Sequence, residues 1–251
     1  MHSNHAGVVT AMKFRNELQK FAFQRFMQRL GLRIDSAKGA PFSYDAGNYP
    51  GVNSAGGAVI FDVGANIGQS AIWYAKNFPR AEIFSFEPFH LIYQELVRNV
   101  QNHPRIRCQN LALSDHDGEM LVPTVADARC QTGKVIAPSA GEATERIKLR
   151  TADSFAEENK IDQIHILKTD TEGFDLAVLA GAAGMLRRRK ISHVLAEATL
   201  FANDAEHTKL SALTDVLVGH GFRLHGLYDL HHDMADGRLL YFNALFSLGR
   251  S

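Results

Sequence analysis

The stretch that decides the fold is AVIFDVGANIG, residues 58–68, a predicted buried strand that ends in a glycine-rich turn. Gly64, Asn66 and Gly68 precede the helical pattern of residues 69–78, and glycine there permits backbone angles and close approaches that a Cβ would forbid. A second strand is expected at 82–86, and Glu87 follows it. A carboxylate in that place can accept both hydroxyls of a ribose. The turn therefore predicts a site for a ribose-containing ligand.

Two such ligands fit, a dinucleotide and S-adenosylmethionine, and the spacing favours the second. A dinucleotide turn needs GxGxxG, because pyrophosphate sits against bare backbone amides at the start of the helix. Here Asn66 takes the middle position and Gln69 the third. S-adenosylmethionine carries no phosphate, so a turn with one side chain at this place can accommodate it.

Composition narrows the functional classes. The chain has 251 residues, of which 45% are hydrophobic, so it can bury one substantial core. Its formal net charge is zero, which gives no reason to expect a nucleic-acid partner. Cys108 and Cys130 cannot make a disulfide framework, and the first ten residues lack the features of a signal peptide. We therefore expect a cytoplasmic protein.

The N-terminal part is predicted to stand apart, with a helix and a loop in residues 1–50 and one domain in residues 51–251. Residues 13–33 have an amphipathic pattern with a basic polar face. This helix could pack on the domain or on a second subunit of a homodimer, or it could contact an anionic or lipid-linked substrate. In the following loop, Tyr44 and Tyr49 could close over a bound substrate, or they could anchor the loop.

From residue 58 onward, strands and helices alternate, which predicts a mostly parallel α/β sheet with helices on both faces. Strands are expected at 58–63, 82–86, 106–113, 164–168, 193–198, 223–228 and 239–247, and helices near 69–78, 89–101, 176–190 and 207–220, with one more helix that begins near residue 151 or 153. The last two strands are joined by residues 229–238, which are too few for a crossover helix. The sheet should therefore end in an antiparallel hairpin.

Five motifs give the chain a resemblance to a known family. They are VIFDVGANIG, FSFEP, NLALSDHDGE, LKTDTEGFDLAVLAGA and YFNALF, within residues 59–246. Together they resemble the FkbM family of methyltransferases, which has the Rossmann-like class I methyltransferase fold with seven strands. The resemblance implies an S-adenosylmethionine-dependent O-methyltransferase acting on a hydroxyl of a sugar, glycan or secondary metabolite.

The resemblance also implies roles for cofactor-binding residues. The residues expected around the methionine portion of S-adenosylmethionine are Asp62, Gly64, Asn66 and Gly68. Glu87 would hold the ribose, and Ala112, Leu113 and Ser114 would lie beside the adenine. Asp115 could bond the adenine amino group, although DHDG is equally a plain turn sequence.

Catalytic candidates follow strands four and five, because ligands bind beyond the carboxyl ends of parallel strands. Asp170 is expected nearest the transferred methyl, in contact with cofactor and acceptor, with Glu172 either orienting it or neutralising the next helix. Glu197 is the third acidic candidate. An alcohol is a poor nucleophile at neutral pH, so a positioned base belongs in the site. Asp170 and Glu197 could also hold a divalent cation, but no third ligand is evident and we expect no metal.

Histidines add substrate candidates, and two other functions stay open. His231 and His232 lie in the predicted hairpin connection, where they could accept a proton near neutral pH or simply be exposed. An NAD-dependent short-chain oxidoreductase could use the same glycine turn, although no YxxxK pair follows the fourth strand. A non-catalytic interaction protein is the other alternative.

Overall fold

The computed structural model describes residues 33–35, 46–52, 56–125, 137–204 and 206–249. The predicted basic helix and Tyr44 lie outside the described residues. Within the part that is described, no helix has the length and apolar character needed to cross a lipid bilayer.

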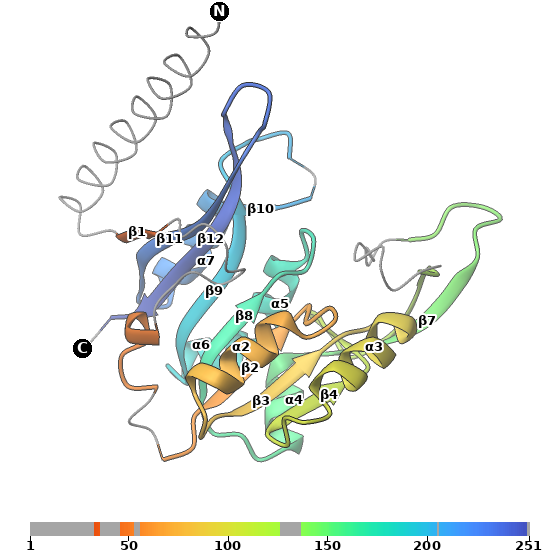
Figure 1. Ribbon diagram of the computed structural model, residues 1–251, viewed down its shortest axis with the longest axis horizontal. Helices are drawn as coiled ribbons and strands as arrows, with labels where there is room; N and C mark the ends of the chain where they lie inside the picture. The colour runs from red at the N-terminus through yellow and green to blue at the C-terminus, as the bar shows by residue number, and fades with distance from the viewer. Residues whose placement is uncertain (1–32, 36–45, 53–55, 126–136, 205, 250–251) are drawn as a thin grey trace, which may run out of the picture.

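One large sheet organises the domain, in the order β1-β11-β12-β9-β8-β2-β3-β4, with β10 paired to β9 (Figure 1). Its strands are β1 (Arg33–Asp35), β2 (Val59–Val63), β3 (Glu82–Phe86), β4 (Ile106–Gln109), β8 (Ile164–Thr169), β9 (Ile191–Thr199), β10 (Thr208–Lys209), β11 (Phe222–His232) and β12 (Leu239–Leu248). Seven of these are the predicted strands, and β1 and β10 are short additions.

Strand direction follows the prediction. β4, β3, β2, β8 and β9 are parallel neighbours, whereas β12 runs antiparallel to both β9 and β11. The chain order reverses between β2 and β8, so the carboxyl ends of these two strands flank the crevice in which ligands of open parallel sheets bind.

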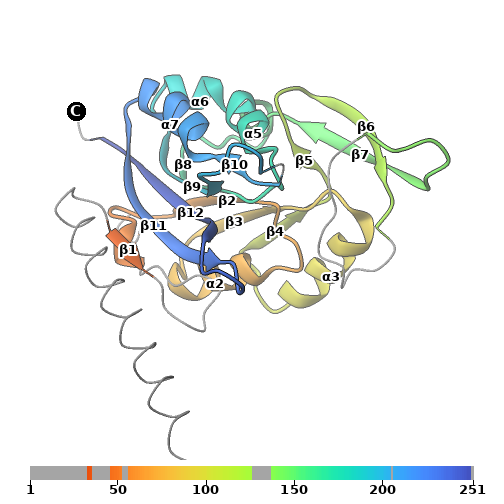
Figure 2. The same cartoon turned by 90° about the horizontal axis from the view of Figure 1, so that it is seen from above.

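Helices cover both faces of the sheet (Figure 2). α2 (Gln69–Asn77) and α3 (His90–Val100) lie on one face, and α4 (Ala152–Glu158), α5 (Asp175–Gly181), α6 (Ala183–Arg187) and α7 (Leu210–Gly219) lie on the other. The central strands are apolar at successive positions because both faces are buried. Ile60 packs in the core below α2 and α3, whereas Phe61 packs in the core below α4 to α7, and both side chains are fully buried.

A second, three-stranded sheet replaces part of a predicted strand. The segment 106–113 is divided between β4 and β5 (Ala112–Leu113), and β5 belongs to the sheet β5-β7-β6. β6 (Gly118–Pro123) and β7 (Thr144–Arg150) are antiparallel and project from the body of the molecule (Figure 1). Leu113 and Ser114 are held by this small sheet, since the Ser114 amide donates to the Arg150 carbonyl at 2.8 Å.

The helix predicted over residues 176–190 is two helices, α5 and α6, separated at Ala182. A new helix begins there because the Asp153 carboxylate accepts the backbone N–H groups of Gly184 and Met185 at 2.6 and 2.7 Å. Gly181 also lets α5 lie against the segment that follows β5, where a Cβ would lie 2.0 Å from the Ser114 carbonyl oxygen.

Tyr49 is not a residue that closes over a ligand. It follows the short helix η1 (Ala46–Asn48), is 2% exposed, and makes edge contacts with the rings of Phe78 and His193. His193 lies near the beginning of β9, and Phe78 ends α2, so Tyr49 lies at the opposite edge of the sheet from the glycine turn. Its apolar ring anchors this segment in the core.

Candidate active site

The turn after β2 is built around a close approach of two backbones. Gly64 has φ +71°, and a Cβ on it would lie 1.9 Å from the carbonyl oxygen of Asp170, beyond β8. The Asp170 amide donates to the Val63 carbonyl at 3.1 Å, and the Gly64 and Ala65 amides both donate to the Phe86 carbonyl. Asn66 also has positive φ, at +50°, so the turn presents its residues to the crevice between β2 and β8.

Lys168 fixes this turn from below, which sequence reasoning did not anticipate. Its ammonium donates to the Gly64 carbonyl at 3.0 Å and lies 3.3 Å from both Asp62 Oδ1 and Asp170 Oδ2. Burial would lower the pKa of Lys168, but the carboxylates of Asp170 and Asp62 outweigh it and raise the pKa above its ordinary value. The buried lysine is therefore charged, and it ties the ends of β2 and β8 together.

Asp62 and Gly68 were both expected beside the cofactor. The structure places both of them in the framework that supports the turn. The Asp62 side chain is fully buried beneath the turn, where it pairs with Lys168 and accepts the Ser70 hydroxyl at 2.7 and 2.8 Å. Gly68, with φ +98°, begins α2, and a Cβ there would lie 2.9 Å from Val100 in α3. Neither residue lines the cleft described next.

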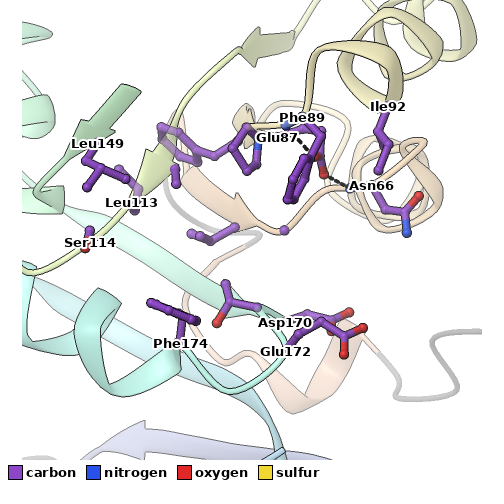
Figure 3. Close-up of a pocket in the computed structure, with 16 residues that line it drawn as sticks. Asn66, Glu87, Phe89, Ile92, Leu113, Ser114, Leu149, Asp170, Glu172 and Phe174 are labelled. Atoms are coloured by element: carbon purple, nitrogen blue, oxygen red, sulfur yellow. Dashed lines mark hydrogen bonds between the residues drawn. The ribbon is translucent and has the colours of Figure 1, made fainter. Parts of the chain in front are cut away.

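A cleft of about 750 Å³ opens above the turn (Figure 3). It has an apolar end and an acidic end. Leu113, Ser114 and Leu149 lie at the apolar end. Asp170 and Glu172 lie at the acidic end, across the cleft from Asn66. The full lining comprises Val63, Gly64, Asn66, Phe86, Glu87, Pro88, Phe89, Ile92, Ala112, Leu113, Ser114, Leu149, Asp170, Thr171, Glu172 and Phe174.

Glu87 lies in the middle of this cleft, after β3, as the sequence predicted. Its side chain accepts the Asn66 amide at 3.1 Å and the Phe89 amide at 3.0 Å, so it joins the glycine turn to the beginning of α3. Desolvation by burial raises the pKa of Glu87 to about 7, against the lowering effect of these two amides.

A second cleft, of about 860 Å³, adjoins the acidic end of the first. The two clefts share Asn66, Asp170 and Glu172. Glu197, Glu206, His207 and Tyr241 complete the lining of the second cleft. Asp170 and Glu172 thus lie where the two clefts meet, and Glu197 lines the second cleft with them.

The predicted acidic residues differ in environment. Glu172 has φ +54° in the turn before α5, whose N-cap residue is Phe174. Glu197, on β9, has a side chain that is 19% exposed. Burial, with a contribution from the Asp170 carboxylate, raises the pKa of Glu197 to about 9. At neutral pH Glu197 is therefore protonated and can donate a hydrogen bond.

His207 and Tyr241 are lining residues that sequence reasoning missed. His207 was expected at the start of a helix, but α7 begins at Leu210, and His207 lies just before β10. Its Nδ1 is 2.9 Å from Asp204 Oδ2 and its Nε2 is 3.5 Å from Glu197 Oε2. The sequence signal that could have found it is the D-x-x-H spacing of Asp204 and His207, typical of a side chain that folds back on a nearby backbone turn.

The remaining candidates lie outside the clefts. His231 and His232 belong to β11 rather than to a loop, and the exposed His231 stacks on Tyr241 with ring centroids 4.2 Å apart. His232 is exposed at the end of β11. Asp115 is exposed next to the first cleft, where its carboxylate accepts the Ser114 hydroxyl at 3.1 Å and contacts His116 at 2.7 Å. Asp115 does not line the cleft.

The Methyltransferase FkbM domain family matches residues 62–224, which hold both the glycine turn and the acidic residues after β8. The chain belongs to this family. The predicted FkbM resemblance is therefore confirmed, and the domain is a methyltransferase domain.

Two of the relatives that match in sequence are named as methyltransferases. The chain is 27% identical over 176 residues to the hexuronic acid methyltransferase AglP of Haloferax volcanii, covering 64% of this chain and 70% of that protein. It is 29% identical over 203 residues to the 31-O-demethyl-FK506 methyltransferase FkbM of Streptomyces tacrolimicus, covering 68% and 75%. It is 25% identical over 203 residues to the AMB antimetabolite synthetase AmbE of Pseudomonas aeruginosa, covering 66% of this chain but only 10% of AmbE.

The methyl donor of this FkbM-type domain is S-adenosylmethionine, and the first cleft fits it. The absence of a Cβ at Gly64 leaves bare backbone beside the acidic end, and the buried Glu87 offers a carboxyl group midway. Phe89, Ile92 and Leu149 supply apolar surface. In the described part of the chain, no group of three or more His, Cys, Asp or Glu side chains could hold a metal ion.

Proposed function

We propose that this FkbM-type domain transfers the methyl group of S-adenosylmethionine to a hydroxyl oxygen of a sugar, glycan or other small-molecule acceptor. The observation that carries the proposal is the meeting of two clefts at Asn66, Asp170 and Glu172. One cleft has the polarity of the donor, apolar at one end and acidic at the other, and its neighbour is lined by polar and acidic side chains. A donor and an acceptor held in adjoining clefts can react without diffusing apart.

Each part of the donor has suitable partners in the first cleft. The adenine would lie at the apolar end, beside Ala112 and Leu113, and the ribose hydroxyls would donate to Glu87. The methionine portion would lie over Gly64 and Asn66, where Asp170 and Glu172 would face its positive sulfonium. This assignment keeps the predicted cofactor residues except Asp62, Gly68 and Asp115.

The acceptor would bind in the second cleft, with its hydroxyl oxygen directed at Asp170. Asp170, Glu172 and Glu197 then surround the reacting atoms from two sides, as expected for catalytic residues. S-adenosylmethionine supplies an electrophilic methyl group on its sulfonium. The chain must align the acceptor oxygen, exclude water and remove one proton, and alignment can supply much of the acceleration.

Calorimetry with S-adenosylhomocysteine and NADH tests the donor assignment. We expect S-adenosylhomocysteine to bind and NADH not to bind. NADH binding without S-adenosylhomocysteine binding would overturn the proposal in favour of an oxidoreductase.

Transfer from methyl-labelled S-adenosylmethionine to a panel of p-nitrophenyl glycosides tests the activity. Asp170→Asn should lower the transfer rate by about tenfold to a hundredfold with a much smaller effect on S-adenosylhomocysteine affinity, because its carboxylate lies where the clefts meet. Asp162→Asn is the matched control, since Asp162 is an exposed carboxylate before β8, at the opposite sheet edge. Equal rates for both variants would count against a catalytic role for Asp170.

A further inference from the structure

His207 has the fixed orientation expected of a proton acceptor. The Asp204 carboxylate can only accept, so the 2.9 Å contact makes His207 Nδ1 the donor and leaves the lone pair of the neutral ring on Nε2. Burial raises the pKa of Asp204, but the Glu206 and His207 contacts outweigh it, so the pKa lies below its ordinary value. Asp204 is therefore a carboxylate at neutral pH.

The imidazole ring of His207 stacks on an aromatic ring along one of its faces. His207 stacks on Tyr241 with ring centroids 4.2 Å apart and an interplanar angle of 13°. His231 covers the opposite face of Tyr241 at 4.2 Å and 11°. Because both faces of Tyr241 are covered, its ring is not a platform for a sugar, and the stack instead limits rotation of His207.

The segment that carries His207 is also fixed along the chain. Asp204 Oδ1 accepts the backbone N–H groups of Glu206 and His207 at 2.8 and 3.0 Å. The next residue, Thr208, pairs with β9 and donates its hydroxyl to the buried Asp175 carboxylate at 2.7 Å. The chain is thus fixed both before and after His207, and His207 itself lines the second cleft.

The acidic residues of that cleft are less suited to accept a proton. Glu197 keeps its own proton at neutral pH. Asp170 lies 3.3 Å from the charged Lys168, so its carboxylate is already engaged in an ion pair. The groups near His207 on neighbouring elements and on its own loop are Glu197, Tyr241, Asp204 and Glu206, with His231 beyond the Tyr241 ring.

We propose, on the basis of the function proposed above, that His207 is the general base of methyl transfer. The acceptor O–H bond breaks, the proton goes to Nε2 of His207, and the oxygen electron pair forms the new bond to the methyl carbon. The carbon–sulfur bond breaks with its electrons remaining on sulfur. Asp204 and Tyr241 are positioning residues. The proton on His207 then passes to water.

Nitrogen-15 NMR of the full chain with S-adenosylhomocysteine bound tests the orientation without any acceptor. The His207 signals are assigned by their loss in His207→Gln. We expect the neutral ring to be protonated at Nδ1, and we expect Asp204→Asn to shift it toward the Nε2-protonated form, since an amide can donate to Nδ1. A ring protonated at Nε2 in the unmodified chain would overturn the proposal.

Kinetics with the p-nitrophenyl glycosides test the proton transfer itself. His207→Gln should lower kcat roughly a hundredfold or more with S-adenosylhomocysteine affinity unchanged, and it should abolish the fall in kcat toward acidic pH. Added imidazole should restore part of the activity of His207→Ala. His220→Gln, at the end of α7, is the matched control.

The two proposals fail in different ways. A chain that binds S-adenosylhomocysteine and methylates a glycoside at the same rate with Gln at position 207 would contradict only the role of His207. A chain that binds no S-adenosylhomocysteine would contradict the proposed function, and the NMR experiment on the unliganded chain would still decide the orientation of His207.

Discussion

At the scale of single residues, buried ionisable side chains of the site differ in protonation state at neutral pH. Lys168 is charged in a buried position because two carboxylates surround it, whereas Glu197 is neutral at pH 7 because it is buried near other acids. Asp204 is ionised next to His207. Pairs of groups whose pKa values are moved in opposite directions are typical of acid–base sites.

The neutral state of Glu197 predicts how stability depends on pH. In the unfolded chain this carboxyl ionises near its ordinary pKa of 4.5, whereas in the folded chain it holds its proton up to about pH 9. Its contribution to stability is thus fully present below pH 4.5 and is lost as the pH rises toward 9. Relative to Glu197→Gln, the unmodified chain should lose stability by about 1.4 kcal/mol per pH unit between these limits.

Urea unfolding of both chains at pH 6, 7 and 8 measures this difference. Glu87 is present in both chains, so its pH-dependent contribution to the free energy of unfolding cancels in the difference. A gap between the two free energies of unfolding that stays constant with pH would mean that Glu197 is ionised in the folded chain.

At the scale of structural elements, the site depends on how closely β2 and β8 approach. Gly64 lets the turn after β2 lie against the Asp170 backbone, and Lys168 bonds both sides of that contact. Gly181 does the same for α5 and the Ser114 segment at the apolar end of the first cleft. Both contacts join segments that are distant in sequence.

Gly64→Ala tests this approach. A Cβ 1.9 Å from the Asp170 carbonyl oxygen must displace backbone, so we expect S-adenosylhomocysteine binding to be lost and the chain to be destabilised by about 2 to 4 kcal/mol. Gly141→Ala is the matched control, because Gly141 has φ +82° and nothing within 4 Å of the added Cβ. The control should lose about 1 kcal/mol and keep its affinity. Equal losses would show that the dihedral angle, and not the close approach, makes glycine necessary.

Local pattern was sufficient to predict much of this architecture. Alternating apolar strands, glycine turns and a short final connection predicted the parallel sheet and its hairpin, and they placed Glu87 and Asp170 after their strands. The split of the 176–190 helix was missed because it depends on Asp153, from another helix. His207 was missed because its orientation depends on Tyr241 and His231, which reach it only through the pairing of β9, β12 and β11.

At the scale of the whole molecule, charge is balanced overall and unbalanced locally. The chain has 27 basic and 27 acidic residues, yet the second cleft is lined by four carboxyl side chains and no lysine or arginine among the described residues. Such a cleft should favour neutral or cationic acceptors over anionic ones. The relative AglP is named for a hexuronic acid, so this chain and that protein need not share an acceptor.

Comparing p-nitrophenyl glucoside with p-nitrophenyl glucuronide measures this selectivity. We expect a KM for the glucuronide that is roughly tenfold higher at low salt, because like charges repel across the cleft, and a smaller difference at high salt. Glu206→Gln should also narrow the difference, since Glu206 is an exposed part of the lining. A lower KM for the glucuronide would show that the acidic lining does not select the acceptor.

The position of Tyr241 on β12, beyond the family match, has an evolutionary consequence. The family match ends at residue 224, before His231 and Tyr241, while the donor-side residues from Gly64 to Asp170 all lie within it. Of the described residues that line the second cleft, Tyr241 alone lies beyond the match, whereas Glu197, Glu206 and His207 lie within it. Under the proposed function, a change in β12 would therefore alter one side of the acceptor cleft and leave the residues proposed to hold the methyl donor intact.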